Sequence, residues 1–232
     1  MLKPLLAAIL ACAIAAPALA QEEIVVTGSK RGGGEMASQV AGVGVKRRAD
    51  FAVQRVTIYG DTRDKAMRRA EILATVKNAI DAGAKRGVAL AYGDSVIRPL
   101  TLANYATKLS FAEDDDRNDA EQVSFIIKTP LKDGDAFAAL DRLSSFIKAV
   151  PLSGRAVIEP DGEAGVSIVD PGQYRAQVIA AIAADATASA KQFGEEYAAQ
   201  VSSLAQPVRW VLTGPTEVLL YIQYDLQIVP KD

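Results

Sequence analysis

The sequence predicts an α+β fold in which helices pack on a mainly antiparallel sheet. Two observations support this class. Apolar residues recur every third or fourth position over residues 63–82, 135–150 and 173–199, as they do in helices with one buried side. Between these segments, apolar and polar residues alternate over short stretches, as they do in strands with one buried face. The predicted order is β-α-β-β-α-β-α-β-β, in two βαβ-type halves.

The folded part is predicted to begin near Asp50. Residues 51–59 favour a strand, which Gly60 ends. Asp61 or Thr62 can cap the next helix, because a side-chain oxygen can accept a free backbone N–H at a helix start. The periodicity of this helix predicts a buried stripe of five residues: Ala66, Ala70, Leu73, Val76 and Ile80.

The middle of the chain predicts one strand within residues 87–102, a hairpin loop at the acidic run 113–116 and a strand over 122–129. Clustered carboxylates can bind Ca²⁺, but the run lacks the spacing of an EF-hand, so a solvated loop is favoured. The helix over residues 135–150 is predicted to bury its apolar side chains, which are Phe137, Leu140, Leu143, Phe146 and Ile147.

The last third of the chain begins with a strand pair or one interrupted strand over residues 156–169. A turn at 170–172 leads into a long alanine-rich helix that is expected to reach about residue 199. Asp185 is the one acid among these alanines, and an exposed position favours it over a buried catalytic role.

The end of the chain has the clearest alternation. Six apolar residues at every second position over 217–228 predict one long strand with a buried face. Residues 207–213 are its predicted partner, and Gly214-Pro215 forms the turn. Trp210 lies on that partner and is expected to anchor the core rather than to stack on a ligand.

The first twenty residues have the pattern of a secretory signal peptide. Lys3 gives a positive start, residues 5–16 form an apolar run, Pro17 breaks it, and Ala20 ends a small-x-small cleavage site. The apolar run is shorter than the roughly 20 residues that span a bilayer. We expect cleavage after Ala20 and a periplasmic location. A lipid anchor on Cys12, which would give an outer-membrane lipoprotein, is the less favoured alternative.

The composition excludes several kinds of catalysis. The 232 residues contain no histidine and one cysteine, Cys12, which cleavage would remove. A histidine-based triad, a cysteine nucleophile and a Cys/His zinc site are therefore excluded from the mature chain. The net charge of −2 provides no field that would recruit nucleic acid. The basic run at residues 46–48 is expected to be solvated rather than to bind phosphate or lipid headgroups.

Residues 21–50 are predicted to form a flexible linker, because their glycines raise the entropic cost of ordering and no periodicity is present. Within this linker, residues 23–29 favour an extended backbone and resemble the TonB box of TonB-dependent outer-membrane receptors. Such a box pairs with a sheet edge of its partner by strand addition. The alternative is that the segment pairs with the protein's own sheet or with nothing. The candidate partner-binding residues are Glu23, Ile24, Val25, Val26 and Thr27.

Several segments of the folded part together carry a resemblance to a known family. They are residues 167–175, the alanine-rich helix up to Phe193-Gly194, the turn and strand start at 214–218, and the first helix with Asp64, Ala66 and Gly83. With these features, residues 51–232 resemble the SIMPL-domain family.

This resemblance implies an exported, usually periplasmic protein from a family without an established catalytic motif, some of whose members form large oligomers. We therefore expect a non-enzymatic cell-envelope protein, without cofactor or metal, that acts as a homo-oligomer or binds partners. No nucleic-acid binding and no transmembrane span of the mature chain are expected. The alternative is an accessory protein whose residues 23–29 pair with a TonB-like protein. An enzyme would have to use carboxylates, Lys or Tyr, and the sequence offers no convergent pair of them.

Overall fold

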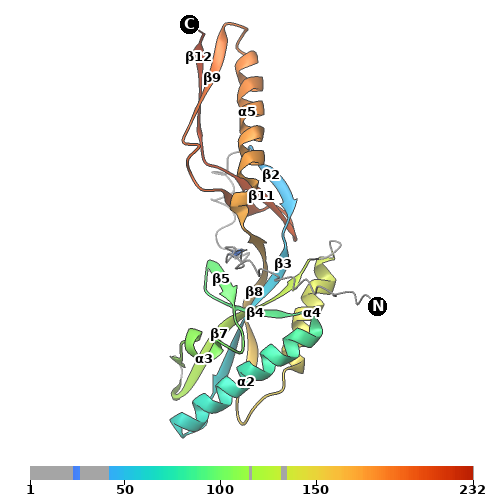
Figure 1. The fold of residues 1–232 in the computed structure, drawn as a ribbon, viewed down its shortest axis with the longest axis vertical. Coiled ribbons are helices and arrows are strands. Elements are labelled where there is room, and N and C mark those ends of the chain that lie inside the picture. Colours follow the sequence, from blue (N-terminus) through green and yellow to red (C-terminus); the bar gives the residue numbers. More distant parts are fainter. Residues whose placement is uncertain (1–22, 27–41, 115–116, 132–134, 232) are drawn as a thin grey trace, which may run out of the picture.

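A computed structural model describes four stretches of the chain, namely residues 23–26, 42–114, 117–131 and 135–231. In these residues, four α-helices pack on antiparallel sheets, which confirms the predicted α+β class. The molecule is elongated, with a body at the bottom of the view and an arm at the top that carries the C-terminus (Figure 1). The expected signal peptide, including Cys12, lies outside the described residues.

The body is built on a seven-stranded sheet with the order β3-β8-β1-β5-β4-β7-β6. The strands are β1 (Glu23–Val26), β3 (Phe51–Gly60), β4 (Ala89–Tyr92), β5 (Val96–Pro99), β6 (Ala112–Asp114), β7 (Arg117–Pro130) and β8 (Val157–Val169). β3 also pairs with β7. The six strands β3, β8, β1, β5, β4 and β7 therefore close on themselves, and we call this closed set the strand ring. β6 and β7 form the hairpin expected around residues 113–116.

The remaining strands form two smaller sheets. β2 (Val45–Arg48), β10 (Arg209–Leu212) and β11 (Glu217–Tyr221) form a three-stranded sheet, and β9 (Tyr197–Ser202) pairs with β12 (Asp225–Pro230). The helices are α2 (Lys65–Arg86), α3 (Tyr105–Lys108), α4 (Ala136–Ala149) and α5 (Arg175–Lys191), and a short 3-10 helix, Pro171–Tyr174, precedes α5. Among the described residues, no helix is long and apolar enough to cross a membrane.

One main core runs from the body to the base of the arm. It joins α2 and α4 to the outer side of the large sheet and continues under the three-stranded sheet to α5. Its largest fully buried side chains include Ile72, Phe125, Phe146, Ile182 and Leu220. A second, small apolar cluster comes from four strands of the ring, and it comprises Val53, Ala91, Ile97 and Ile126.

The buried face of α2 differs from the predicted one. Ala66 and Ala70 are exposed, and the buried stripe consists of Arg68, Ile72, Thr75, Val76, Ala79 and Gly83. The helix is rotated because Arg68, which the pattern placed on the polar side, turns inward to a carboxylate on β7. The cap also differs, since the Asp64 carboxylate accepts the Met67 N–H at 2.7 Å in place of Asp61 or Thr62.

The apolar face of α4 is narrower than predicted. Ala139, Leu143 and Phe146 are buried, and their spacing of four and three residues places them on one side of the helix. Phe137 and Leu140 lie away from that side, and Phe137 is 80% exposed. The prediction that these two side chains are core residues was therefore wrong.

The end of the chain changes sheet where one strand was predicted. Residues 217–228 divide into β11 and β12, which pair in different sheets. The preceding helix ends at Lys191 instead of about residue 199, because the chain turns at Gly194, whose φ of 126° favours glycine. Residues 87–102, predicted to hold one strand, form the two strands β4 and β5.

The segment expected to be a linker contains two strands. β1 pairs in the large sheet, and β2 pairs with β11. The basic run at residues 46–48 lies in β2, and only part of it is exposed to solvent as predicted. Arg47 donates to Asp50 at 2.6 Å, and its guanidinium lies 4.3 Å from the centre of the Tyr174 ring. Alternation along β2 turns Arg47 inward and leaves Lys46 and Arg48 exposed.

Candidate protein-binding surfaces

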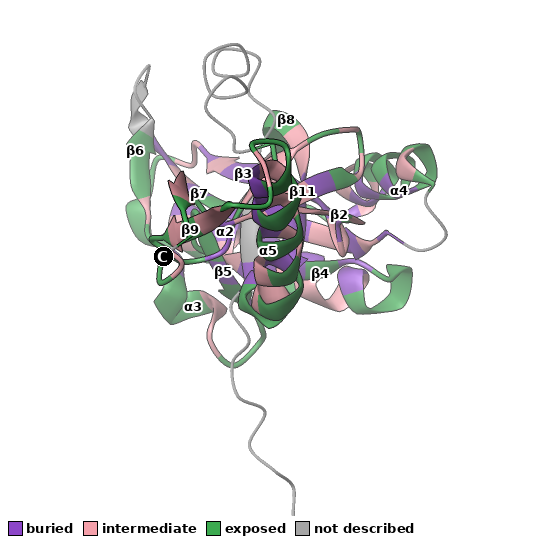
Figure 2. Ribbon diagram, turned by 90° about the horizontal axis from the view of Figure 1, so that it is seen from above, coloured by how far each residue is buried: buried purple, intermediate pink, exposed green. Residues whose placement is uncertain are grey.

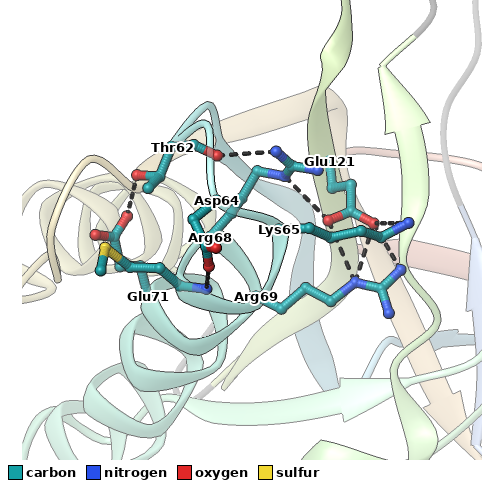
Figure 3. Close-up of polar contacts among 8 residues, drawn as sticks. Thr62, Asp64, Lys65, Arg68, Arg69, Glu71 and Glu121 are labelled. Carbon is teal, nitrogen blue, oxygen red and sulfur yellow. Dashed lines mark hydrogen bonds and ion pairs between the residues drawn. The ribbon is translucent and has the colours of Figure 1, made fainter.

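Glu121, which lies on β7 directly before the predicted strand 122–129, gathers three basic side chains from α2 (Figure 3). Its carboxylate is 4% exposed and accepts from Arg69 Nη2 at 2.6 Å and Arg68 Nε at 3.0 Å, and Lys65 Nζ lies 3.6 Å away. The hydrogen bond from Arg69, followed by that from Arg68, holds the pKa of Glu121 below its ordinary value despite burial. A carboxylate held in its charged form is suited to a structural ion cluster and not to proton donation.

A chain of polar contacts extends from this cluster to the loop before β8. Arg68 donates to the Thr62 carbonyl at 2.8 Å, and the Thr62 hydroxyl donates to Glu71 at 2.6 Å (Figure 3). Glu71 also accepts the backbone N–H of Arg155 at 3.2 Å. The Arg155 guanidinium binds both oxygens of Asp61, at 2.7 and 2.8 Å. These contacts fix the loop against the start of α2.

A cleft of about 600 Å³ lies beside this loop. Two carboxylates line it, Asp61 and Glu159, together with Tyr59 and Arg155. Asp61 is bound by Arg155 at both carboxylate oxygens, and the other carboxylate, Glu159, is exposed. Within the described part of the chain, no group of three or more Asp, Glu, Cys or His side chains is placed to hold a metal ion.

Sequence reasoning missed Glu121 and the inward turn of Arg68. The available signal was a carboxylate directly before an alternating strand, together with three basic residues on one turn of the helix before it. Neither feature identifies its partner, since Arg68 and Glu121 are 53 residues apart in the chain.

Four of the five candidate partner-binding residues, Glu23, Ile24, Val25 and Val26, form β1, and Thr27 lies outside the described residues. β1 pairs with β8 on one side and with β5 on the other. Residues Glu23–Val26 thus pair with the protein's own sheet, which was one of the alternatives left open by the sequence. By doing so it closes the strand ring.

Glu23 anchors β1 through a buried polar cluster. Its carboxylate accepts from the Ser167 hydroxyl at 2.6 Å and forms an ion pair with the Lys128 ammonium. The same ammonium lies 4.4 Å from the centre of the Phe51 ring. Lys128 is 12% exposed and Ser167 is fully buried, so strands β1, β7 and β8 meet at a charged contact shielded from water.

The arm consists of α5, β9 and β12 and is thinner than the body (Figure 1). Only Val178, Ile182, Ala186 and Ala190 of α5 are buried, and much of its surface is exposed (Figure 2). No residue of β9 or β12 is fully buried. In the described structure each of these strands pairs only with the other, so each has one unpaired edge.

The apolar face of the β9–β12 pair lies against α5. The register sets Leu226 opposite Val201 and Ile228 opposite Ala199, and all four side chains are half-buried. Asp185 contributes to this side and is half-buried instead of exposed, since it contacts Tyr224. Burial, and then the charge of Asp185, raise the pKa of Tyr224.

Comparison with known proteins assigns no family to this fold. No protein-family model matches the chain, and no curated protein and no solved structure match it. The strand pairing itself gives the candidate surfaces, which are the strand ring closed by β1 and the unpaired edges of the arm.

Proposed function

We propose that this chain is a non-enzymatic protein of the cell envelope, of SIMPL type, that works by assembling with copies of itself. The observation that carries the proposal is the unpaired edge of β9 in the arm. Exposed strand edges are templates for pairing with another chain, and soluble proteins usually protect them with lysine, proline or bulges. The sequence of β9, Tyr-Ala-Ala-Gln-Val-Ser, contains neither lysine nor proline.

A second copy is the partner that best fits this edge. Two identical strands can pair antiparallel about a two-fold axis, because the same edge is then used twice. Pairing of this kind would extend the two-stranded sheet of the arm to four strands. It would also cover apolar side chains that a single helix leaves half-buried.

The polar residues of the body support a binding role over a catalytic one. Glu121 is held charged by Arg69 and Arg68, and Asp61 is bound by Arg155 at both oxygens. These two carboxylates are thus committed to contacts that hold the fold. Location in the periplasm follows from the signal-peptide pattern of residues 1–20, with cleavage after Ala20.

The edge can be tested by adding charge to it. The double variant Ala198→Lys/Gln200→Lys places two ammonium groups on one face of β9. When β9 pairs with its own copy, these like charges face each other and oppose the pairing. We expect the native mass of the chain 21–232, measured by light scattering, to fall toward that of a single chain.

The matched control is Gln177→Lys/Ala180→Lys on α5. It makes the same two substitutions at exposed positions of the arm and leaves β9 intact. We expect this variant to keep the mass of the parent protein. Equal masses for the two variants and the parent would contradict assembly through the β9 edge.

Strand addition of residues 23–29 to a TonB-like protein stays a prediction. It requires β1 to leave two neighbouring strands, since both of its edges are paired. Capture of the chain by a TonB-like protein, and loss of that capture when residues 21–34 are deleted, would support it. Capture that the deletion does not change would contradict it.

A further inference from the structure

β1 fills a slot whose two sides come from distant parts of the chain. Its four residues pair with β8, and Glu23 and Ile24 also pair with β5. We propose that β1 is an exchangeable strand, and that in the assembled protein Glu23–Val26 of one copy fills the slot of a second copy. The inference rests on the proposed self-assembly and names one of its contacts.

The slot is costly to leave empty. Without β1, facing edges of β5 and β8 lose their hydrogen-bond partners, and the strand ring opens. Lys128, which is only 12% exposed, would also lose the Glu23 carboxylate, and breaking an ion pair that is shielded from water is unfavourable. Some strand is therefore expected to occupy the slot at all times.

The chemistry of the slot selects this particular strand. Lys128 and Ser167 converge on one carboxylate, at the position where Glu23 lies opposite Ile97 and Val169. An extended segment with an acidic residue at this position, followed by residues that favour a strand, satisfies the slot. Each copy of the chain carries such a segment in Glu23–Val26.

The connection between β1 and β2 is long enough for exchange. Residues 27–44 join the two strands, and six of these eighteen residues are glycine. Eighteen residues span at most about 60 Å when extended. Because β1 makes the same contacts in either copy, exchange loses no contact, and protein concentration sets its extent.

Disulfide trapping between two single-cysteine chains tests the exchange, because residues 21–232 contain no native cysteine. Ile24 lies opposite Val96 of β5, and Val96 is exposed, so the variants are Ile24→Cys and Val96→Cys. The two chains carry tags of different size and are mixed, unfolded together, refolded and oxidised. Each chain lacks a partner cysteine across its own slot, so a disulfide between positions 24 and 96 can form only between two chains. We therefore expect a disulfide-linked heterodimer on a non-reducing gel.

Two controls give this result its meaning. The double variant I24C/V96C reports whether the geometry allows a disulfide across the slot. Mixing the I24C chain with a Leu102→Cys chain gives the background of random collisions, because Leu102 is exposed and lies outside β1, β5 and β8. The proposal is overturned when I24C and V96C chains give no more heterodimer than this background while I24C/V96C closes within one chain.

A charge-reversal pair provides a second test. Glu23→Lys and Lys128→Glu each put like charges in the slot of their own chain. In a mixture, the strand of either variant matches the slot of the other. We expect the mixture to form heterodimers and to melt at a higher temperature than either variant alone. A mixture that melts as its components do would contradict the exchange.

Light scattering on the parent chain separates this proposal from self-assembly in general. A discrete oligomer without cross-linking between I24C and V96C would overturn the exchange and leave assembly standing. A single-chain mass without cross-linking would overturn both.

Discussion

At the scale of single residues, Glu121 is the side chain whose replacement we expect to destabilise the body most. Glu121→Gln keeps the size of the side chain and leaves the buried Arg68 guanidinium without a counter-charge. Removing one partner of a buried ion pair is strongly destabilising. Because the glutamine keeps one side-chain oxygen that can still accept a hydrogen bond, we expect the free energy of unfolding to fall by about 2–4 kcal/mol. Urea unfolding at pH 7 measures it.

Glu113→Gln is the control for this substitution. Glu113 lies opposite Glu121 in the β6–β7 register, and its side chain is exposed. We expect it to change stability by less than about 0.5 kcal/mol. Equal effects of the two substitutions would contradict the structural role of the Glu121 cluster.

The contribution of Glu121 to the free energy of unfolding depends on pH in a defined direction. Because the folded protein lowers the pKa of Glu121, its contribution is complete above the pKa of an unfolded glutamate, about 4.3. The contribution is lost as the pH falls through the lowered value in the folded state. The stability difference between wild type and E121Q should therefore be full at pH 7 and shrink below about pH 4.3. A difference that stays constant down to pH 3 would show that Glu121 is not held charged.

At the scale of elements, the start of α2 depends on the cap by Asp64. The Asp64 carboxylate accepts the Met67 N–H at 2.7 Å, and replacement of such a cap by alanine costs about 1 kcal/mol. We expect Asp64→Ala to lose that amount in urea unfolding and Asp64→Ser to restore most of it. Asp81→Ala removes an exposed ion pair with Lys77 on the same helix and should cost only a few tenths of a kcal/mol. A larger loss in D81A than in D64A would contradict this assignment.

Periodicity located the elements better than it located their faces. The three long helices and the strands at 51–59 and 122–129 follow from the sequence pattern, because local spacing determines which residues share a side. The rotation of α2 does not follow from it, since Arg68 is drawn inward by a carboxylate 53 residues away. The alternation over 217–228 also continues across the change of sheet, with Ile222 buried and Tyr224 half-buried, so it conceals that break.

The candidate surfaces were only partly predictable for the same reason. Residues 23–29 stood out by their preference for an extended backbone, but β5 and β8, the neighbours of β1, lie far along the chain. The Glu23 anchor depends on Lys128 and Ser167, which no local pattern connects to it. The first half of β9 lay within a segment expected to be helical up to about residue 199, because the turn at Gly194 follows an uninterrupted alanine-rich pattern.

At the scale of the whole molecule, the body and the arm differ in how completely they are built. The body has a strand ring and an extended buried core, whereas the arm has one helix, two strands and two unpaired edges. A second copy would complete the arm by pairing along β9. We therefore expect the chain to be self-assembled in solution.

The native mass of the chain 21–232 is the first measurement of this self-assembly. Light scattering on a sizing column, at two protein concentrations, gives the mass without reference to shape, which matters for an elongated molecule. We expect one discrete mass that corresponds to two or more chains. The mass of one chain at both concentrations would contradict self-assembly.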